Sequence, residues 1–221
     1  MERMPEPDLM TEIEQVDAYG KADFEEPHSN FIYLLKKYCH DTLALNSVLD
    51  LGSGAGDILL RFANAFPNSN IDAVDGSAAM LKFTERLLSS DPGVKEQIKL
   101  IHSMIQDLSH SKSYDLIMSN SLLHHLHRPL ELWDKIKEMS RPGTYVFIMD
   151  LLRPDSPDEA KELVRVYAGD EPGILQRDFY NSLLAAFTID EVREQLGEAG
   201  LGKLKVEQVS DRHFIVYGYS I

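Results

Sequence analysis

Short apolar runs alternate along this chain with segments in which apolar residues recur at helical spacing. The pattern predicts strands at 47–51, 70–75, 98–103, 114–119, 144–150, 203–208 and 212–219. It predicts helices at 31–38, 56–66, 78–88, 129–140, 156–169, 174–186 and 188–200. Strands that alternate with helices are typical of an α/β fold built on a parallel sheet.

The alternation stops at 154–187, where two helical segments follow each other without a strand between them. The residues Thr188–Glu191 form a T-x-x-E capping box, which predicts the start of a further helix. The last two strands then close the chain as a hairpin. We therefore expect an N-terminal arm over 1–40, and one domain over 41–221 that carries a helical insertion.

A glycine-rich turn follows the first predicted strand, where residues 50–57 read D-L-G-S-G-A-G-D. Strand, glycine turn and helix in this order build a nucleotide pocket in α/β folds. A dinucleotide fingerprint requires glycine where Asp57 stands. Asp50 and Asp57 should repel a pyrophosphate and favour a cationic ligand, and Asp75 at the end of the next strand is placed to accept both ribose hydroxyls. This set describes S-adenosylmethionine better than NAD.

At 50–56 and at Asp75 the sequence resembles the class I S-adenosylmethionine-dependent methyltransferases, whose first motif (D/E-x-G-x-G-x-G) it matches in full. The resemblance implies a Rossmann-like, doubly wound, seven-stranded sheet with the last strand antiparallel, an N-terminal helical lid, and S-adenosyl-L-homocysteine as the product. It implies cofactor contacts at Tyr19, Asp50, Gly52, Ser53, Gly54, Gly56, Asp75, Gly76, Met80, Met104, Ile105, Asn120 and Ser121.

Two parts of that contact set have alternatives. The family usually places an acid after the third strand to hold the adenine amino group, and here Met104 takes its place. Met104 and backbone near Ile105 would then hold the adenine, unless Gln106 or Asp107 reaches it. Before the core, the segment around Tyr19 and Phe24 is expected to fold over the cofactor as a lid, or to be a frayed arm. Ser29 or Asn30 is expected to cap the helix that follows.

His124 and His125 are the first candidates for catalysis, because a histidine titrates near neutral pH and follows the fourth strand. The alternative is that the pair braces its loop. A third histidine, His127, suggests a metal site, but no cysteine or acid stands at ligand spacing beside the three, so no metal is expected.

The insertion carries a polar stripe that could face an acceptor. Asp178, Asn181 and Ser182 are expected to share one helix face, with Asp178 and Asn181 as catalytic candidates and Tyr180 and Ser182 as substrate contacts. Alternatively, Asp178 is a helix N-cap. Arg153 is expected to fix an anionic acceptor, or to pair with Asp150 or Asp178.

Composition limits the kinds of partner and the cellular compartment that we expect. The 221 residues carry a net charge of −14, which argues against a nucleic-acid acceptor. No run of eighteen apolar residues predicts a membrane span, and the polar start predicts no signal peptide. One cysteine fits a reducing cytoplasm. The oligomeric state stays open, a homodimer included.

The function predicted from the sequence is methyl transfer from S-adenosyl-L-methionine to a small-molecule acceptor. A methyltransferase that acts on a protein or on RNA is the first alternative. An NAD-dependent oxidoreductase and a non-catalytic binding protein that keeps the cofactor pocket are the others. The sequence does not indicate whether O, N, S or C accepts the methyl group.

Overall fold

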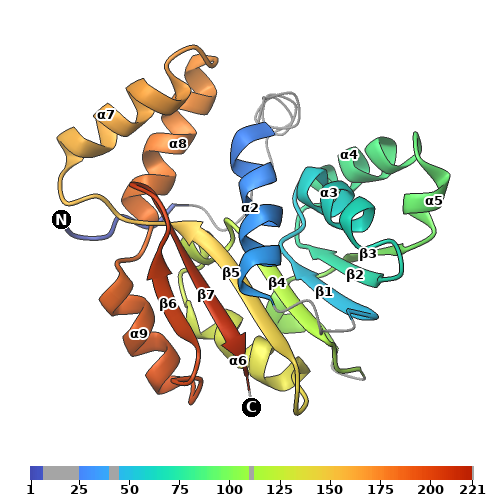
Figure 1. The fold of residues 1–221 in the computed structure, drawn as a ribbon. Helices are drawn as coiled ribbons and strands as arrows, with labels where there is room; N and C mark the ends of the chain where they lie inside the picture. The colour runs from blue at the N-terminus through green and yellow to red at the C-terminus, as the bar shows by residue number, and fades with distance from the viewer. Residues whose placement is uncertain (7–24, 40–44, 110–111, 221) are drawn as a thin grey trace.

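The computed structural model describes residues 1–6, 25–39, 45–109 and 112–220. Seven strands form a single sheet with helices on both faces (Figure 1). The strands are β1 (Ser47–Leu51), β2 (Asn70–Asp75), β3 (Ile98–His102), β4 (Leu116–Asn120), β5 (Tyr145–Leu151), β6 (Lys205–Gln208) and β7 (His213–Tyr219). The helices are α2 (Glu25–Tyr38), α3 (Asp57–Ala65), α4 (Ala78–Leu88), α5 (Pro92–Lys95), α6 (Leu130–Met139), α7 (Pro157–Ala168), α8 (Gly173–Ala185) and α9 (Ile189–Glu198), with 3-10 turns η1 (Ile105–Asp107) and η2 (Leu123–His125).

The sheet order is β3-β2-β1-β4-β5-β7-β6. The strands from β3 to β5 pair in parallel, while β7 runs antiparallel to both β5 and β6. The doubly wound sheet with an antiparallel last strand is therefore confirmed. The order reverses between β1 and β4, and a ligand crevice is expected outside the carboxyl ends of the strands at such a point.

Two apolar cores fill the two faces of the sheet. On one face Phe31 of α2 packs edge-on against Phe147 of β5, with ring centroids 5.2 Å apart. On the other face α6 and α9 bury Trp133, whose indole N–H donates to Gln195. The insertion forms a third cluster in which α7 packs against α8 (Figure 1). The two helices thus form a cover beside the sheet.

Most element boundaries lie within two residues of the predicted ones, and three differences have a local cause. α2 starts at Glu25, because two acids occupy its first turn and the Glu25 carboxylate accepts a hydrogen bond from the Ser29 hydroxyl. The expected N-cap at Ser29 or Asn30 is therefore wrong. α5 was missed, although Asp91 caps it ahead of Pro92. The capping box is confirmed, since Thr188 and Glu191 bond each other's backbone N–H.

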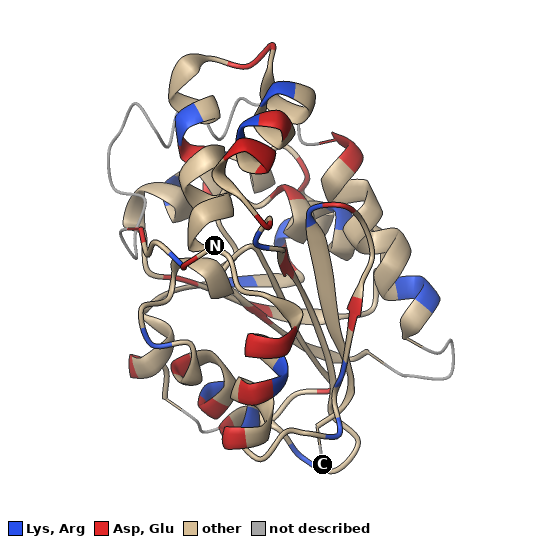
Figure 2. Cartoon of the chain, turned by 90° about the vertical axis from the view of Figure 1, so that its left-hand side faces the viewer, with Lys and Arg blue, Asp and Glu red and all other residues tan. Residues whose placement is uncertain are grey.

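The charged residues of the described chain are interspersed in sign over the helices (Figure 2). None of the described helices is long and apolar enough to cross a membrane. Tyr19 and Phe24, and with them the expected lid, lie outside the described residues.

Candidate functional site

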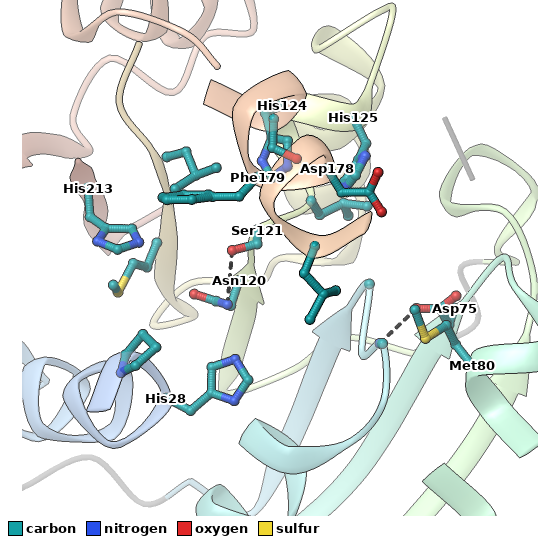
Figure 3. A pocket seen from close by; sticks show the side chains of 18 of the residues that line it. His28, Asp75, Met80, Asn120, Ser121, His124, His125, Asp178, Phe179 and His213 are labelled. Atoms are coloured by element: carbon teal, nitrogen blue, oxygen red, sulfur yellow. Dashed lines mark hydrogen bonds between the residues drawn. The ribbon is translucent and has the colours of Figure 1, made fainter. Parts of the chain in front are cut away.

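A cavity of about 430 Å³ opens at the carboxyl ends of β1, β2, β4 and β5 (Figure 3). This volume is in the range of small-molecule sites. The cavity lies at the switch point of the sheet, and the cover formed by α7 and α8 supplies part of its wall. The predicted cofactor contacts that line it are Gly52, Gly54, Asp75, Gly76, Met80, Met104, Ile105, Asn120 and Ser121.

The glycine turn needs its glycines for two different reasons. Gly52, Gly54 and Gly56 all have positive φ, at 75°, 55° and 87°, where other residues are strained. A Cβ on Gly54 would meet nothing within 4 Å, because this residue faces the cavity. A Cβ on Gly56 would lie 2.5 Å from Thr84 Cγ2, so Gly56 allows α4 to pack closely against the turn.

Asp75 ties the glycine turn to the end of β2. Its Oδ2 accepts from the Gly54 N–H at 2.8 Å and its Oδ1 accepts from the Ser77 N–H at 2.7 Å. Burial raises the pKa of Asp75, although the two N–H groups oppose the shift. Each carboxylate oxygen has a further lone pair, so Asp75 can accept from a ligand at the cavity wall without giving up its hold on the turn.

Among the expected cofactor contacts that the structure describes, three do not line the cavity. Asp50 is buried beneath the turn, where burial and the neighbouring Asp75 raise the pKa of Asp50 to about 7. Ser53 and Gly56 lie on the turn but away from the cavity wall. Asp57 does not fence the ligand either, because its Oδ2 lies 2.7 Å from both His28 Nδ1 and Arg61 Nε. Neither Asp50 nor Asp57 lines the cavity, and the expected repulsion of a pyrophosphate by these two acids stays a prediction.

Ser121 stands at the centre of the site in a strained conformation. It follows β4 and has a φ of 55°, and it is the one non-glycine residue with positive φ in the described part of the chain. Asn120 Nδ2 donates to Ser121 Oγ at 3.1 Å (Figure 3). Strain of this kind is kept where the surroundings fix it, and it concentrates at functional sites.

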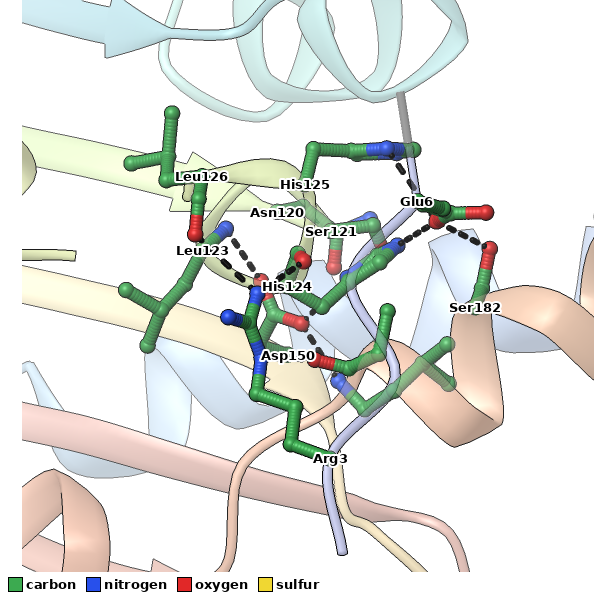
Figure 4. Close-up of polar contacts among 12 residues, drawn as sticks. Arg3, Glu6, Asn120, Ser121, Leu123, His124, His125, Leu126, Asp150 and Ser182 are labelled. Carbon is green, nitrogen blue, oxygen red and sulfur yellow. Dashed lines mark hydrogen bonds and ion pairs between the residues drawn. The ribbon is translucent and has the colours of Figure 1, made fainter. Parts of the chain in front are cut away.

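The two histidines of η2 face a carboxylate from the far N-terminus (Figure 4). His124 Nδ1 lies 2.6 Å from Asp150 Oδ1, and Glu6 Oε1 lies 3.6 Å from His124 Nε2 and 3.2 Å from His125 Nδ1. Burial lowers the pKa of His124, but Asp150 and Glu6 outweigh burial and the pKa is raised. Burial also raises the pKa of Glu6. Both histidines line the cavity.

Residues 1–6 are held between η2 and α8 by a network centred on Arg3. The Arg3 guanidinium donates to the carbonyls of Ala185, His124 and Leu126 at 2.6 to 3.0 Å, and it lies over the Phe187 ring. Ser182 Oγ donates to Glu6 Oε1 at 2.9 Å. Sequence reasoning missed this contact, because nothing local relates Glu6 to residues more than a hundred positions later.

The polar stripe of α8 is partly as expected. Asp178 and Ser182 line the cavity, one turn apart on a face that they share with Leu175 and Phe179. α8 begins at Gly173, so Asp178 is not its N-cap. Asn181 is wrong as a member of this face: it is exposed and does not line the cavity.

Two further predicted substrate contacts lie outside the cavity wall. Tyr180 packs against the cluster between α7 and α8 instead. Arg153 is buried and donates to Glu191 at 2.6 Å, so its partner is neither the acceptor nor Asp150 nor Asp178.

Several lining residues had been given no role from the sequence. His28 comes from α2, Tyr167 from α7 and Met149 from β5. His213 opens β7 opposite Leu151, which brings it to the same sheet edge, and burial lowers its pKa to about 4. An antiparallel last strand starts at the edge where the parallel strands end, which is why His213 reaches the cavity.

Comparisons with known proteins agree with this geometry. Residues 49–146 match a family described as "Methyltransferase domain". The malonyl-[acyl-carrier protein] O-methyltransferase of Halalkalibacterium halodurans is 32% identical over 97 residues, which make up 44% of this chain and 36% of that protein. The tRNA1(Val) (adenine(37)-N6)-methyltransferase of Pedobacter heparinus is 40% identical over 75 residues, 34% of this chain and 31% of that protein. The matched segments thus span about a third of each relative's own length.

Solved structures extend the likeness to almost the whole chain. A SAM-dependent methyltransferase from Aquifex aeolicus superposes with a TM-score of 0.68 at 18% identity, covering 96% of this chain and 100% of the other. This level of identity shows a common fold.

Proposed function

Since the chain belongs to the class I S-adenosylmethionine-dependent methyltransferases, we propose that it transfers a methyl group from S-adenosyl-L-methionine to a small-molecule acceptor and releases S-adenosyl-L-homocysteine. The observation that carries this proposal is the Asp75 carboxylate, which lies on the cavity wall hydrogen-bonded to the backbone of the glycine turn. A ribose needs an acceptor at the end of the second strand, and a cofactor needs the close backbone approach that Gly54 allows.

Different parts of the cofactor are assigned to different groups of lining residues. Asp75 accepts from the ribose hydroxyls, while Met80, Met104 and Ile105 provide the apolar surface for the adenine. The methionine end lies along Gly52 and Gly54. This arrangement leaves the sulfonium near the end of β4, beside Ser121.

The wall beyond Ser121 is suited to an acceptor with an apolar body. Met149, Leu151, Leu175 and Phe179 line it, and the cover formed by α7 and α8 supplies part of this wall. Methyl transfer is an in-line displacement, and holding nucleophile, methyl and sulfur in line can lower the barrier by up to ~7–11 kcal/mol. His124 and His125 on the same wall, together with Glu6 beside them, are assigned to activation of the acceptor.

The net charge of −14 weighs against RNA as the acceptor, although one relative methylates tRNA by its name. A nucleic-acid enzyme gains much of its affinity from lysine and arginine at phosphates. The interspersed charges in Figure 2 offer no such basic band within the described residues.

The proposal is tested in two steps. Calorimetry of the chain with S-adenosyl-L-homocysteine and with NAD⁺ should show binding of the first and none of the second, and the reverse result would overturn the cofactor. A panel of small acceptors is then assayed by release of S-adenosyl-L-homocysteine.

A matched pair of α8 variants checks the acceptor wall. Asp178→Ala should lower turnover and leave cofactor affinity unchanged, because Asp178 lines the cavity away from the glycine turn. Asn181→Ala is the control: it lies on the same helix outside the cavity and should change neither quantity. Equal turnover in both variants would remove α8 from the acceptor site.

A further inference from the structure

The side chains of Glu6, His124 and His125 converge beside the cavity (Figure 4). Glu6 Oε1, His124 Nε2 and His125 Nδ1 lie within 4.8 Å of one another. The carboxylate oxygen is 3.2 Å from one imidazole nitrogen and 3.6 Å from the other. Neighbouring ligand atoms around a metal ion with bonds of about 2.1 Å stand roughly 3 Å apart. Small side-chain shifts therefore bring all three to coordination distance.

Asp150 fixes which nitrogen of His124 faces the cluster. Its Oδ1 accepts from His124 Nδ1 at 2.6 Å, and it is itself held by the backbone N–H groups of Leu123 and Leu151, both at 2.8 Å. Because Nδ1 faces Asp150, the other ring nitrogen of His124, Nε2, is the one directed toward the Glu6 carboxylate. A carboxylate behind a metal-binding histidine is the usual outer partner of such a site.

We propose that Glu6, His124 and His125 bind one divalent first-row transition-metal ion. Two imidazoles and one carboxylate form a ligand set that suits zinc, iron or nickel better than magnesium or calcium, which prefer oxygen alone. Within the described residues the cluster offers three protein ligands, and two of them, His124 and His125, line the cavity. An ion held by these two histidines would therefore lie next to the space assigned to the acceptor.

Glu6 is positioned for this role by its neighbours. Ser182 Oγ donates to Glu6 Oε1, and His127 Nε2 lies 2.8 Å from the Glu6 carbonyl oxygen. Arg3 directs its hydrogen bonds to the carbonyls of η2 and α8, which anchors the residues before Glu6. The acid absent from the neighbourhood of the histidines in the sequence is thus supplied by the other end of the chain, and the reason for expecting no metal falls away.

The role of the ion rests on the proposed function and specifies the acceptor as a hydroxyl compound. A metal ion lowers the pKa of a bound hydroxyl. The acceptor oxygen loses its proton to solvent water and forms the O–CH₃ bond, while the S–CH₃ bond breaks and its electron pair stays on sulfur. The histidine pair then acts by holding the ion rather than by taking the proton.

The test uses the full chain, freed of metal with a chelator and titrated with Co²⁺ alone. We expect one Co²⁺ per chain, with the visible d–d absorption of an ion bound by nitrogen and oxygen. Glu6→Gln and His125→Asn should each weaken binding by at least ~10-fold, and Asp150→Asn by ~10- to 100-fold through His124. His102→Asn is the control for adventitious binding, since this exposed imidazole lies outside the cluster, and it should leave the affinity unchanged.

Binding of S-adenosyl-L-homocysteine, followed in the same variants, separates the two proposals. If S-adenosyl-L-homocysteine binds and Co²⁺ does not, the metal site is refuted and the proposed function stands. The same holds if Glu6→Gln and His125→Asn bind Co²⁺ as tightly as the wild type does. If Co²⁺ binds at the cluster and S-adenosyl-L-homocysteine does not bind, the cofactor assignment fails instead. Circular dichroism of each variant verifies that a lost site is not a lost fold.

Discussion

Replacing Asp75 with asparagine tests the cofactor assignment most directly. The substitution keeps the size of the side chain but replaces one oxygen with an amide donor. Asp75 accepts from Gly54 at one oxygen and from Ser77 at the other, so the amide must face one of these N–H groups or turn away. Either choice removes an acceptor from the ribose position.

The expected loss follows from the worth of a charged hydrogen bond. Such a bond contributes about 1.5–3 kcal/mol, and every ~1.4 kcal/mol is a factor of ten in affinity. We therefore expect Asp75→Asn to raise the Kd for S-adenosyl-L-homocysteine about 10- to 100-fold in calorimetry. Asp75→Ala should lose at least as much, because it also releases the glycine turn.

Asp72 provides the matched control on the same strand. Its Oδ2 accepts from Lys112 and Tyr114 at 2.8 and 2.7 Å, and it does not line the cavity. Asp72→Asn should lower stability and leave the Kd unchanged. An Asp75→Asn protein that is folded and binds with the wild-type Kd would refute the ribose assignment.

Three further predictions concern stability and are read from denaturant unfolding. Gly56→Ala should lower the free energy of unfolding by at least about 1–2 kcal/mol, because φ is 87° and the new Cβ meets Thr84. Gly54→Ala has open space around its Cβ and should lower it less. Equal losses in the two variants would contradict the packing role of Gly56. Burial raises the pKa of Asp50 to about 7, so between about pH 4 and 7 the folded chain keeps a proton that the unfolded chain loses. Raising the pH through this window should lower the free energy of unfolding of the wild type more than that of Asp50→Asn, by up to about 4 kcal/mol; parallel pH profiles would disprove the burial effect. Arg3→Ala removes three hydrogen bonds to carbonyls and should cost about 2–3 kcal/mol, and an unchanged midpoint would mean that residues 1–6 do not dock in solution.

Short local patterns in the sequence were enough to predict much of the fold and the residues proposed to bind the cofactor. The glycine turn, Asp75 and the Thr188–Glu191 capping box depend on residues close together in the chain, and their physical meaning is fixed by that spacing. Ser121 was predicted as a cofactor contact from its place after the fourth strand, but its positive φ was not, because a serine gives no sign of that conformation.

The part of the cavity proposed for the acceptor was predicted less well, because it depends on contacts between distant segments. The partner of Arg153 is Glu191, whereas the sequence had suggested Asp150 or Asp178. Helix periodicity alone could not tell which face of α8 turns inward, and Asn181 was assigned to the wrong one. Glu6 meets His125 across more than a hundred residues, and only the folded chain brings them together.

The insertion leaves the sheet and returns to it at a single point. Leu152 pairs with Phe187 as an isolated parallel bridge, and the Arg153 N–H donates to the Phe187 carbonyl at 3.2 Å. The two helices between them are therefore a cassette whose ends already lie side by side. Exchanging this cassette for that of another chain with the same sheet would require no change in strand register, so acceptor choice could diverge while the donor-binding half is preserved.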